Sequence, residues 1–422
     1  MIERLTVSLA PGYGGQGAGQ GDGPQERVIG QLGRDPARRG FALEWDAEFA
    51  AAPLPIWPVH TRQYSGLLRG PETRPGALPG LFEDSLPDGW GRLLLDREIN
   101  AAGASRAQLD DLHRLAFVGT QGMGALSYRP VTAPQSAAEL DLSWFEGVIG
   151  RIDDETDLEV LQRLRVISGG SQGARPKFVA QIGPDQRSLR DHRAPWQEGW
   201  THVLIKGRGS LDPKGAIEAE LAYGALMRRA GIDCQQMFSL KGSLETFFAT
   251  HRFDRDQGRR RHMASVAGLL NTGLQHGVFD YVDLMRLAKT LCLNKAQTAE
   301  ELFRRMVFNV RAISRDDHIR NHALLMDTAG QWHLAPAFDV TFDPGPGGEH
   351  SMAVAGEGRA PGQGAFATVA EIGGIKAKRR DQIIAEVDAA LADWPQVAQE
   401  HGVPKPLRQT IEREIAAARR WA

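Results

Sequence analysis

A carboxylate and an amide side chain lie close together in a polar stretch of the C-terminal half. Asp316 and Asn321 are five residues apart in FNVRAISRDDHIRNHALLM, residues 308–326. Catalytic loops for phosphoryl transfer use this spacing, because one carboxylate accepts a hydroxyl proton and one oxygen ligand helps to hold Mg²⁺. Magnesium prefers such hard oxygen donors. The stretch therefore predicts phosphoryl transfer, with Asp316 as the base; the alternative is a charged turn without function.

A second carboxylate follows at a useful distance along the chain. Asp339 stands eighteen residues after Asn321, in LAPAFDV, where we expect the end of a strand. Two oxygen ligands on consecutive elements of a hairpin can share one metal ion. The sequence thus predicts Asn321 and Asp339 as magnesium ligands.

A glycine-rich segment and a lysine precede this stretch. The segment SGGSQGARPK, residues 168–177, can bring backbone N–H groups close to a polyphosphate. Lys206 ends the apolar strand THVLIK and can hold the phosphates, while Glu220 on the next helix can orient it. The alternatives are a plain turn, an exposed lysine and a solvated carboxylate. The segment matches neither a Walker A loop, which ends in GK[ST], nor a Rossmann fingerprint, which follows a strand.

Two histidines in the same stretch offer a different chemistry. His318 and His322 are spaced i, i+4, as in zinc metalloproteases, but Ile319 stands where such a motif needs glutamate. We therefore expect His318 to orient the catalytic loop by hydrogen bonds. For the basic cluster Arg259–His262 we favour a solvated hairpin arm over a contact for phosphate or for a partner.

Composition limits the classes of function. The chain has 422 residues, of which 42% are hydrophobic and 24% charged, as in an ordinary globular protein of two or three domains. Fifty basic and 52 acidic residues leave no electrostatic footprint for nucleic acid. The two cysteines cannot form a disulfide framework. No apolar run approaches the roughly 20 residues that span a bilayer, and no signal peptide is visible. We expect a cytoplasmic protein without membrane contact.

The elements that must position these residues fall into three parts. Residues 1–10 are expected to form an edge strand, followed by a loop at 12–24, and a helix is expected to start at Asp88, with Trp90, Leu93, Leu94 and Ile99 on its apolar side. We place a domain boundary near residue 135. Beyond it we expect strands at 178–182 and 202–206, a helix at 216–229 and a hairpin at 245–265 with its tip at 256–258. After residue 265 we expect mainly helices, apart from loops at 313–345 and 343–365.

The predicted fold class is α+β. A mixed N-terminal subdomain, residues 1–135, precedes a two-lobed domain of the protein-kinase kind, residues 136–422. Its small lobe is rich in strands and reaches to about residue 262, and its large lobe, residues 263–422, is mainly helical.

At this point the sequence resembles a known family. The segments LPGLFEDSLPDGWGRLLL and VGTQGMGAL resemble the N-terminal subdomain of HipA, the kinase toxin of bacterial HipBA toxin–antitoxin modules. GSQGARPK, THVLIK, HRFDR, DDHIRN and APAFD occur in the order of its kinase part. The resemblance covers nearly the whole chain.

The resemblance implies a serine/threonine kinase with ATP and Mg²⁺ as cofactors. Asp316, Lys206 and His318 would act in catalysis. The residues that it places around the nucleotide are Gln172, Gly173, Ala174, Arg175, Pro176, Lys177, Lys206, His251, Arg252, Phe253, His318, Arg320, Asn321, Phe338 and Asp339. His251 to Phe253 would be the hinge beside adenine.

One position departs from the family. The autophosphorylated serine of the family falls on Gly170 here, so Ser171 and Ser168 are the candidate acceptors, unless autophosphorylation is absent. The resemblance also implies a helix-turn-helix antitoxin like HipB, contact with DNA only through that antitoxin, and a protein substrate such as an aminoacyl-tRNA synthetase. Two alternatives stay open: an ATP-binding pseudokinase that serves as an antitoxin-bound corepressor, and a kinase for small molecules.

Overall fold

The structure is a computed structural model of the chain. It describes residues 2–13, 25–37, 40–61, 63–87, 89–103, 109–132, 140–152, 155–169, 173, 175–272 and 279–421. Asp88, the predicted boundary near residue 135 and most of the predicted loop at 12–24 lie outside these ranges.

The N-terminal part is built on an antiparallel sheet of five strands, in the order β4-β3-β2-β1-β5. Its strands are β1 (Arg4–Leu9), β2 (Arg27–Asp35), β3 (Gly40–Trp45), β4 (Leu67–Arg69) and β5 (Leu126–Arg129). The predicted edge position of β1 is wrong, because β5 returns to pair with its free side. Leu5, Val7 and Leu9 accordingly have no exposed surface. Helices α1 (Ala47–Ala51), α2 (Gly80–Glu83) and α4 (Asp111–Val118) complete this part.

A second antiparallel sheet of five strands has the order β7-β6-β8-β10-β9. Its strands are β6 (Lys177–Ile182), β7 (Leu189–Asp191), β8 (Thr201–Lys206), β9 (Met237–Lys241) and β10 (Thr246–His251). Helices α5 (Leu142–Ile149), α6 (Leu158–Ser168) and α7 (Ala216–Arg229) belong to the same region. The two predicted strands are confirmed to within one residue at their starts, and the predicted helix has the bounds of α7.

Helix α3 (Gly89–Ala101) joins the two parts. It comes from the N-terminal part of the sequence, yet Trp90 and Leu94 belong to the core under the second sheet, with Phe145, Leu161 and Phe178. The apolar side that the spacing predicts is buried at Trp90 and Leu94, but the side chain of Leu93 is 36% exposed. Helix α3 therefore packs into the core of the second sheet, whereas the N-terminal sheet shares a separate core with the C-terminal helices.

The predicted hairpin at 245–265 is correct only at its tip. The short strands β11 (Arg255–Asp256) and β12 (Arg259–Arg260) pair with each other. β10 instead pairs with β8 and β9. β13 (His262–Ser265) pairs with β14 (Ala323–Met326), which pairs with β15 (Trp332–Leu334). Strands β14 and β15 fall within residues 313–345, which we expected to form a loop, and they supply the hairpin expected before Asp339.

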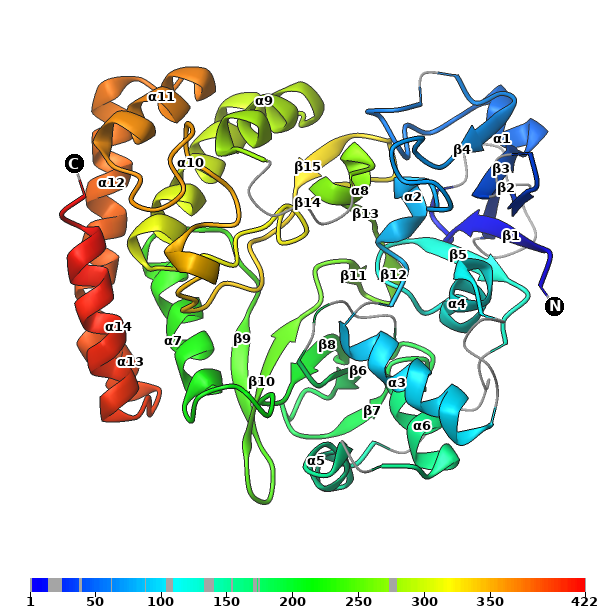
Figure 1. Ribbon diagram of the computed structural model, residues 1–422, viewed down its shortest axis with the longest axis horizontal. Coiled ribbons are helices and arrows are strands. Elements are labelled where there is room, and N and C mark those ends of the chain that lie inside the picture. Colours follow the sequence, from blue (N-terminus) through cyan, green and yellow to red (C-terminus); the bar gives the residue numbers. More distant parts are fainter. Residues whose placement is uncertain are drawn as a thin grey trace.

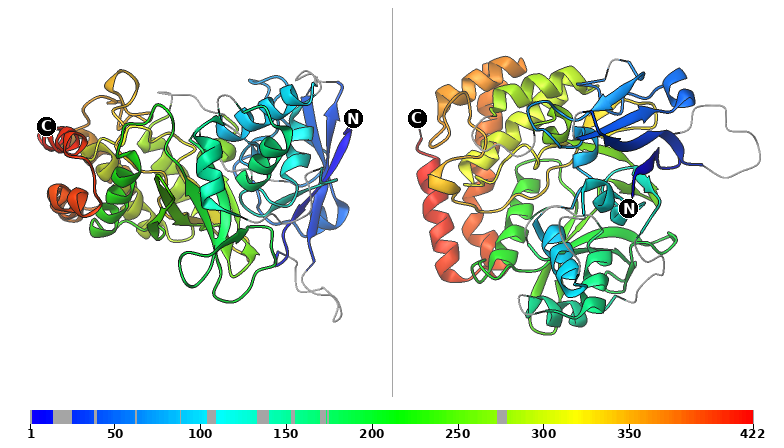
Figure 2. Two further views of the ribbon diagram at one scale, coloured as in Figure 1. Left: turned by 90° about the horizontal axis from the view of Figure 1, so that it is seen from below. Right: turned by 45° about the vertical axis from the view of Figure 1, so that its right-hand side comes forward.

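The rest of the chain beyond residue 265 is mainly helical, as predicted. The helices are α8 (Val266–Leu270), α9 (Tyr281–Leu291), α10 (Lys295–Arg311), α11 (Gln363–Gly373), α12 (Ala377–Ala392), α13 (Trp394–Glu400) and α14 (Lys405–Ala418), with a short 3₁₀ turn, η3 (Pro346–Gly348). Figure 1 shows α9 to α14 on one side of the molecule and the N-terminal sheet on the other, with α8 between them beside α2. The two ends of the chain lie far apart (Figure 2).

Buried arginines fasten the tip of the hairpin to the N-terminal part. Arg260 donates to the carbonyl oxygens of Thr120 and Leu126, both at 2.6 Å, and Arg255 donates to that of Gly122 at 2.7 Å. The solvated arm that we favoured for the basic cluster is therefore wrong for Arg260. Arg259 and Arg261 fit it, since both are exposed, whereas His262 is buried.

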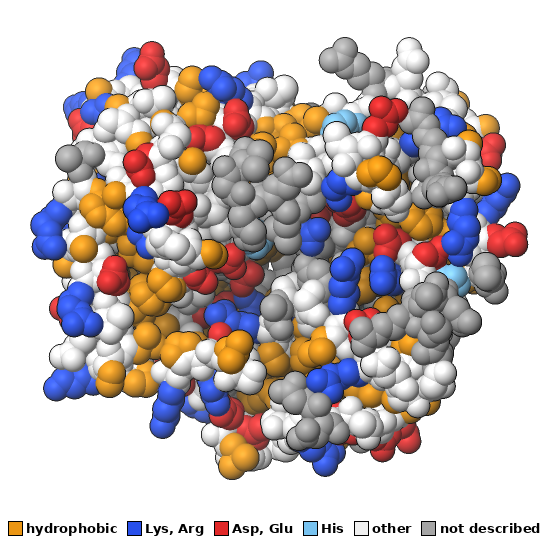
Figure 3. Space-filling view, viewed as in Figure 1, with side chains coloured by type: hydrophobic (Ala, Val, Ile, Leu, Met, Phe, Trp, Pro, Cys, Tyr) orange, Lys and Arg blue, Asp and Glu red, His pale blue; other side chains and the backbone are white. Residues whose placement is uncertain are grey.

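Among the described residues, no helix has both the length and the apolar character needed to cross a membrane. On the face seen in Figure 3, acidic and basic side chains gather near the middle, between the C-terminal helices and the second sheet. The residues with predicted chemistry come from this region.

Candidate active site

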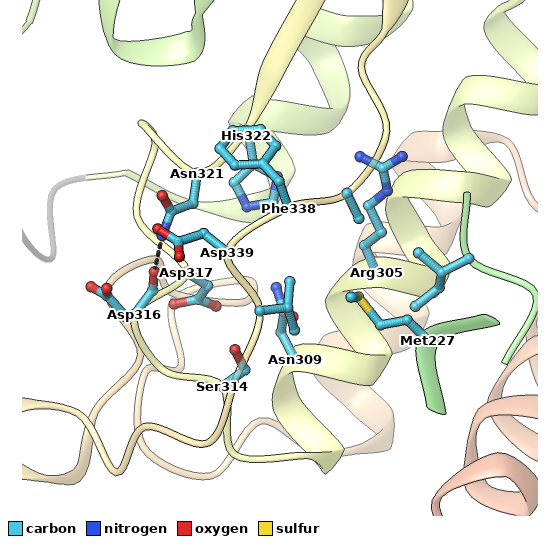
Figure 4. A pocket seen from close by; sticks show the side chains of 13 residues that line it. Met227, Arg305, Asn309, Ser314, Asp316, Asp317, Asn321, His322, Phe338 and Asp339 are labelled. Atoms are coloured by element: carbon cyan, nitrogen blue, oxygen red, sulfur yellow. Dashed lines mark hydrogen bonds between the residues drawn. The ribbon is translucent and has the colours of Figure 1, made fainter. Parts of the chain in front are cut away.

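The loop between α10 and β14 folds back on itself and brings Asp316 close to Asn321. The amide nitrogen of Asn321 donates to the backbone carbonyl oxygen of Asp316 at 2.7 Å, and its backbone N–H donates to that of His318 at 2.8 Å. The first bond leaves the amide oxygen of Asn321 available as a ligand. Figure 4 shows the side chains of Asp316, Asn321 and Asp339 around one space.

Asp339 reaches the same space after the β14–β15 hairpin. Its φ is +57°, a conformation that few residues other than glycine adopt. Its neighbours hold it there: the N–H of Ala337 donates to the carbonyl oxygen of Asp233 at 2.7 Å, and the ring of Phe338 lies 5.3 Å from that of Phe253. The hairpin thus delivers Asp339 to Asn321, as the sequence predicts.

Lys206 connects the second sheet with this space. Its ammonium lies 2.8 Å from a carboxylate oxygen of Glu220 on α7 and also donates to the carboxylate of Asp339. The side chains of Lys206 and Glu220 are only 5% and 2% exposed. The ion pair that the sequence suggested for Glu220 is therefore present, and the alternatives of an exposed lysine and a solvated carboxylate are wrong.

The charges of this cluster support one another. Burial alone would raise the pKa of Asp339, but the neighbouring ammonium groups of Lys206 and Lys177 hold it well below its usual range. Burial alone would lower the pKa of Lys206, whereas Asp339 and Glu220 raise it above its usual range. Both groups therefore keep their charges in the cleft at neutral pH.

Asp316 has a different environment. Its side chain is 54% exposed, so its oxygens can meet a molecule in the cleft. Partial desolvation raises the pKa of Asp316, His318 at 3.6 Å opposes this, and the carboxylates of Asp339 and Asp343 add to it. A raised pKa suits a proton acceptor better than a permanent ligand.

The described part of the glycine-rich segment lies against the same cluster. Gly173 has φ +102°, a backbone conformation that favours glycine, and the ammonium of Lys177 lies close to its Cα. Arg175 lies 2.9 Å from Asp212 and 3.6 Å from Glu220. The carbonyl oxygen of Pro176 accepts the N–H of Gly207. Gln172, Ala174 and Ser171 lie outside the described residues.

Ser168 is placed where a phosphate donor cannot reach it. It is buried, its hydroxyl donates to the carbonyl oxygen of Leu164 at 2.8 Å, and it accepts the indole N–H of Trp90 at 3.1 Å. In this conformation Ser168 is a structural residue, which argues against it as the autophosphorylation site.

Several hydrogen-bonding groups of the predicted hinge, residues 251–253, already have partners within the protein. The guanidinium of Arg252 binds Asp254 at 2.8 and 2.9 Å. The backbone N–H of Arg252 donates to the carbonyl oxygen of His202. The backbone N–H of His251 likewise donates to the carbonyl oxygen of Gln236. The backbone N–H groups of His251 and Arg252 are therefore already bonded within the protein, and the ring of Phe253 lies beside that of Phe338.

The remaining predicted residues flank the catalytic loop. Arg320 is half-buried beside Asp84, a carboxylate of the N-terminal part. His322 is buried, and its ring packs edge-on against that of Tyr281 at 5.8 Å. His322 is thus part of the core, which disfavours the zinc interpretation that pairs it with His318.

Two residues beside Asp316 were missed by the sequence analysis. Asp317 is fully buried, accepts the hydroxyl of Tyr281 at 2.8 Å and the N–H of Ser351 at 2.9 Å, and pairs with His350 at 3.0 Å. Arg315 donates to the carbonyl oxygens of Pro344 and Arg359. Together they anchor the segment 343–359 next to the catalytic loop. Their only signal in the sequence is their place beside Asp316.

A cavity of ≈ 20 Å³ lies behind these residues, between α7, α10 and the two loops. Its lining includes Asp316, Asn321, His322, Phe338 and Asp339. It has room for about one water molecule.

Comparison with known families decides the membership of the chain. Residues 169–394 match the HipA-like C-terminal domain, and residues 24–129 match the HipA N-terminal domain. The chain belongs to the HipA family. No curated protein gives a significant match in sequence.

A solved HipA structure has the same fold. The Shewanella oneidensis MR-1 HipA, from its complex with HipB and operator DNA, superimposes with a TM-score of 0.67 at 16% identity, over 98% of this chain and 96% of that one. The Helicobacter pylori proinflammatory kinase CtkA gives a TM-score of only 0.39 at 10% identity, over 54% of this chain and 89% of its own. This score is too low to indicate a shared fold. The HipA match confirms the predicted fold class, a mixed N-terminal subdomain followed by a two-lobed, kinase-like domain.

Proposed function

We propose that this HipA-family protein is an ATP- and Mg²⁺-dependent kinase that phosphorylates serine or threonine side chains of a protein. The observation that carries the proposal is the convergence of Lys206, which is paired with Glu220, on the oxygen-bearing side chains of Asp339, Asn321 and Asp316. Lys206 binds Asp339 and Glu220, and Asp339 shares its space with Asn321 and Asp316. Such an arrangement fits the terminal phosphates of a nucleotide and its metal ion.

The donor set suits magnesium. Asp339 offers a carboxylate and Asn321 an amide oxygen, and both are hard ligands on neighbouring elements. Asp339 stays ionised, because Lys206 and Lys177 hold its pKa low. When bound, the ion would neutralise charge on the phosphates.

The side chains of the cleft then have separate roles. Lys206 holds phosphate oxygens, kept in place by Glu220. Asp316 accepts the proton of the acceptor hydroxyl while that oxygen forms a bond to the γ-phosphorus, and the bond from the γ-phosphorus to the leaving ADP oxygen breaks. His318 stays near Asp316 and orients the loop.

The biological role follows from membership of the family. We propose that the protein is the toxin of a toxin–antitoxin module, with a helix-turn-helix antitoxin like the HipB of the Shewanella complex, and that it reaches DNA only through that antitoxin. An aminoacyl-tRNA synthetase is the proposed substrate class. The cytoplasmic location stays a prediction from the sequence.

The test uses purified protein with labelled ATP, Mg²⁺ and a cell extract. Wild type is expected to label at least one protein band, and Asp316→Ala is expected to label none. Identical labelling by both proteins, or by neither, would contradict the proposal.

One observation favours a second function. Gly170 stands where relatives carry the autophosphorylated serine. A pseudokinase that binds ATP and serves as corepressor would bind the nucleotide and an antitoxin but transfer no phosphate. The labelling experiment, combined with a measurement of ATP binding, separates the two functions.

A further inference from the structure

The segment 80–92 of the N-terminal part touches both loops of the candidate site. It contains α2 and the first turn of α3, and it lies outside the cleft itself. Two of its residues make the contacts: Asp84 toward the catalytic loop and Trp90 toward the glycine-rich segment.

Asp84 is a buried carboxylate that binds the end of β13. One of its oxygens accepts the N–H of Ser265 and the other accepts the Ser265 hydroxyl, both at 2.6 Å. The hydroxyl oxygen of Ser265 in turn accepts the N–H of Gly268 at 3.0 Å, which caps the start of α8. Asp84 therefore fixes the position and direction of this short helix.

The first turn of α8 holds the catalytic loop. The N–H of Val266 donates to the carbonyl oxygen of His322 at 2.8 Å, and that of Ala267 donates to the carbonyl oxygen of Ile319 at 3.3 Å. These two carbonyl groups flank Asn321. Arg320, between them, also lies close enough to Asp84 for their charges to interact. A shift of α8 would thus move Asn321 and, through its bond to the Asp316 backbone, the proposed base.

Trp90 makes two contacts at the other end. Its backbone N–H donates to the carbonyl oxygen of Gly173 at 2.9 Å, and its indole N–H donates to the hydroxyl of Ser168 at 3.1 Å. Ser168 and Gly173 both belong to the glycine-rich segment 168–177. The indole ring is 1% exposed, so Trp90 has little freedom to move.

We propose that Asp84 and Trp90 are positioning residues for the kinase reaction, Asp84 for the catalytic loop and Trp90 for the glycine-rich segment. This inference rests on the proposed function. Neither side chain reaches the reacting atoms: Trp90 acts through hydrogen bonds to the glycine-rich segment, and Asp84 acts through Ser265 and the first turn of α8. The N-terminal subdomain then helps to position the catalytic loop and the glycine-rich segment.

The experiment compares four variants in the full-length chain. Asp84→Asn and Ser265→Ala weaken the link to α8, Trp90→Phe keeps the ring but removes the indole donor, and Leu93→Ala on the same helix serves as control. The readouts are kcat and the KM for ATP in the labelling reaction, and hydrogen–deuterium exchange of residues 312–326. Thermal unfolding checks that each variant is folded.

The two contacts are expected to affect different kinetic constants, kcat for Asp84 and the KM for ATP for Trp90. Asp84→Asn and Ser265→Ala are expected to lower kcat by up to about 10²-fold with little change in KM, because a small misplacement of catalytic groups has that effect. They should also speed exchange in residues 312–326. Trp90→Phe is expected to raise the KM for ATP by about 2- to 10-fold, the weight of one hydrogen bond, with kcat unchanged. Leu93→Ala should match wild type.

The outcomes separate this inference from the proposed function. An active wild type whose Asp84→Asn and Ser265→Ala variants keep wild-type kcat and exchange would overturn the role of Asp84 and leave the kinase proposal intact. A KM for Trp90→Phe equal to that of Leu93→Ala would overturn the role of Trp90. Should wild type transfer no phosphate, the kinase proposal fails, and the exchange of residues 312–326 alone decides whether Asp84 holds the loop.

Discussion

Two buried clusters of charge in this protein look alike in composition but differ in what their donors and acceptors do. In the cleft, Lys206 lies between Glu220 and Asp339. Near the hairpin tip, Asp254 lies between the guanidinium groups of Arg252 and Arg255. Arg255 and Arg260 also donate hydrogen bonds to backbone carbonyl oxygens within residues 120–126.

The difference lies in the ligand capacity that remains. Asp339 has a side chain 33% exposed and faces Asn321 and Asp316 across an open space. Asp254 has a side chain 1% exposed, and it also accepts the N–H of Gly124 at 2.7 Å. Buried charge therefore marks an active site only where oxygen ligands still face a cleft, and elsewhere it fastens one part of the chain to another.

The largest expected effect lies in the cleft and concerns rate alone. Asp316→Asn should lower phosphate transfer by about 10²- to 10⁴-fold, the usual effect of losing a general base. Because the side chain of Asp316 is 54% exposed, the free energy of unfolding should hardly change. Labelling assays and urea denaturation on the same preparation check both statements. A variant that loses both stability and activity would contradict the prediction that this change affects the rate alone.

The matching change at the other cluster should act on stability. Asp254→Ala leaves two buried guanidinium groups without their shared carboxylate, which should lower the free energy of unfolding by about 3–5 kcal/mol. Urea denaturation measures it. If Asp254→Ala unfolds at the wild-type urea concentration, the account of this cluster as a fastening is wrong.

A smaller effect concerns pH. The pKa of Asp316 is raised by desolvation and by neighbouring carboxylates, so this group takes up its proton at a higher pH than an ordinary aspartate. A base works only when it is unprotonated, so kcat should fall as the pH drops through this raised pKa. Rate profiles at saturating ATP test the direction. An acid limb at or below the ordinary aspartate pKa of about 3.9 would contradict it.

The smallest effect belongs to the exposed pair at the hairpin tip. Arg261 and Asp256 lie 2.7 Å apart with side chains 49% and 51% exposed. Arg261→Ala should change the free energy of unfolding by less than about 1 kcal/mol, since water screens such pairs. This variant is the matched control for Asp254→Ala, and a loss of similar size in both would remove the distinction between fastening and surface arginines.

The sequence predicted the features that depend on local spacing. The approach of Asp316 to Asn321, the bounds of α7 and the strand that ends at Lys206 each follow from a few consecutive residues. Pairings between distant segments could not be predicted in this way. The return of β5 to β1 and the pairing of β13 with β14 join residues more than 50 positions apart, so no local pattern specifies them.

The roles of neighbouring like residues were also beyond the sequence. Asp316 and Asp317 are adjacent and chemically identical, yet one faces the cleft and the other holds Tyr281 and Ser351. Arg260 and Arg261 divide in the same way between a buried and an exposed position. Only the direction of each side chain in the fold separates them.

We propose that Asp339 and Asn321 hold a magnesium ion on the phosphates of a nucleotide beside Lys206. The most direct test of this proposal is calorimetric titration of ATP into wild type and Asp339→Asn, with and without Mg²⁺. The account predicts that Mg²⁺ tightens the binding of ATP to wild type and makes no difference to Asp339→Asn. Wild type that ignores Mg²⁺, or a variant that keeps the full effect of the ion, would contradict it.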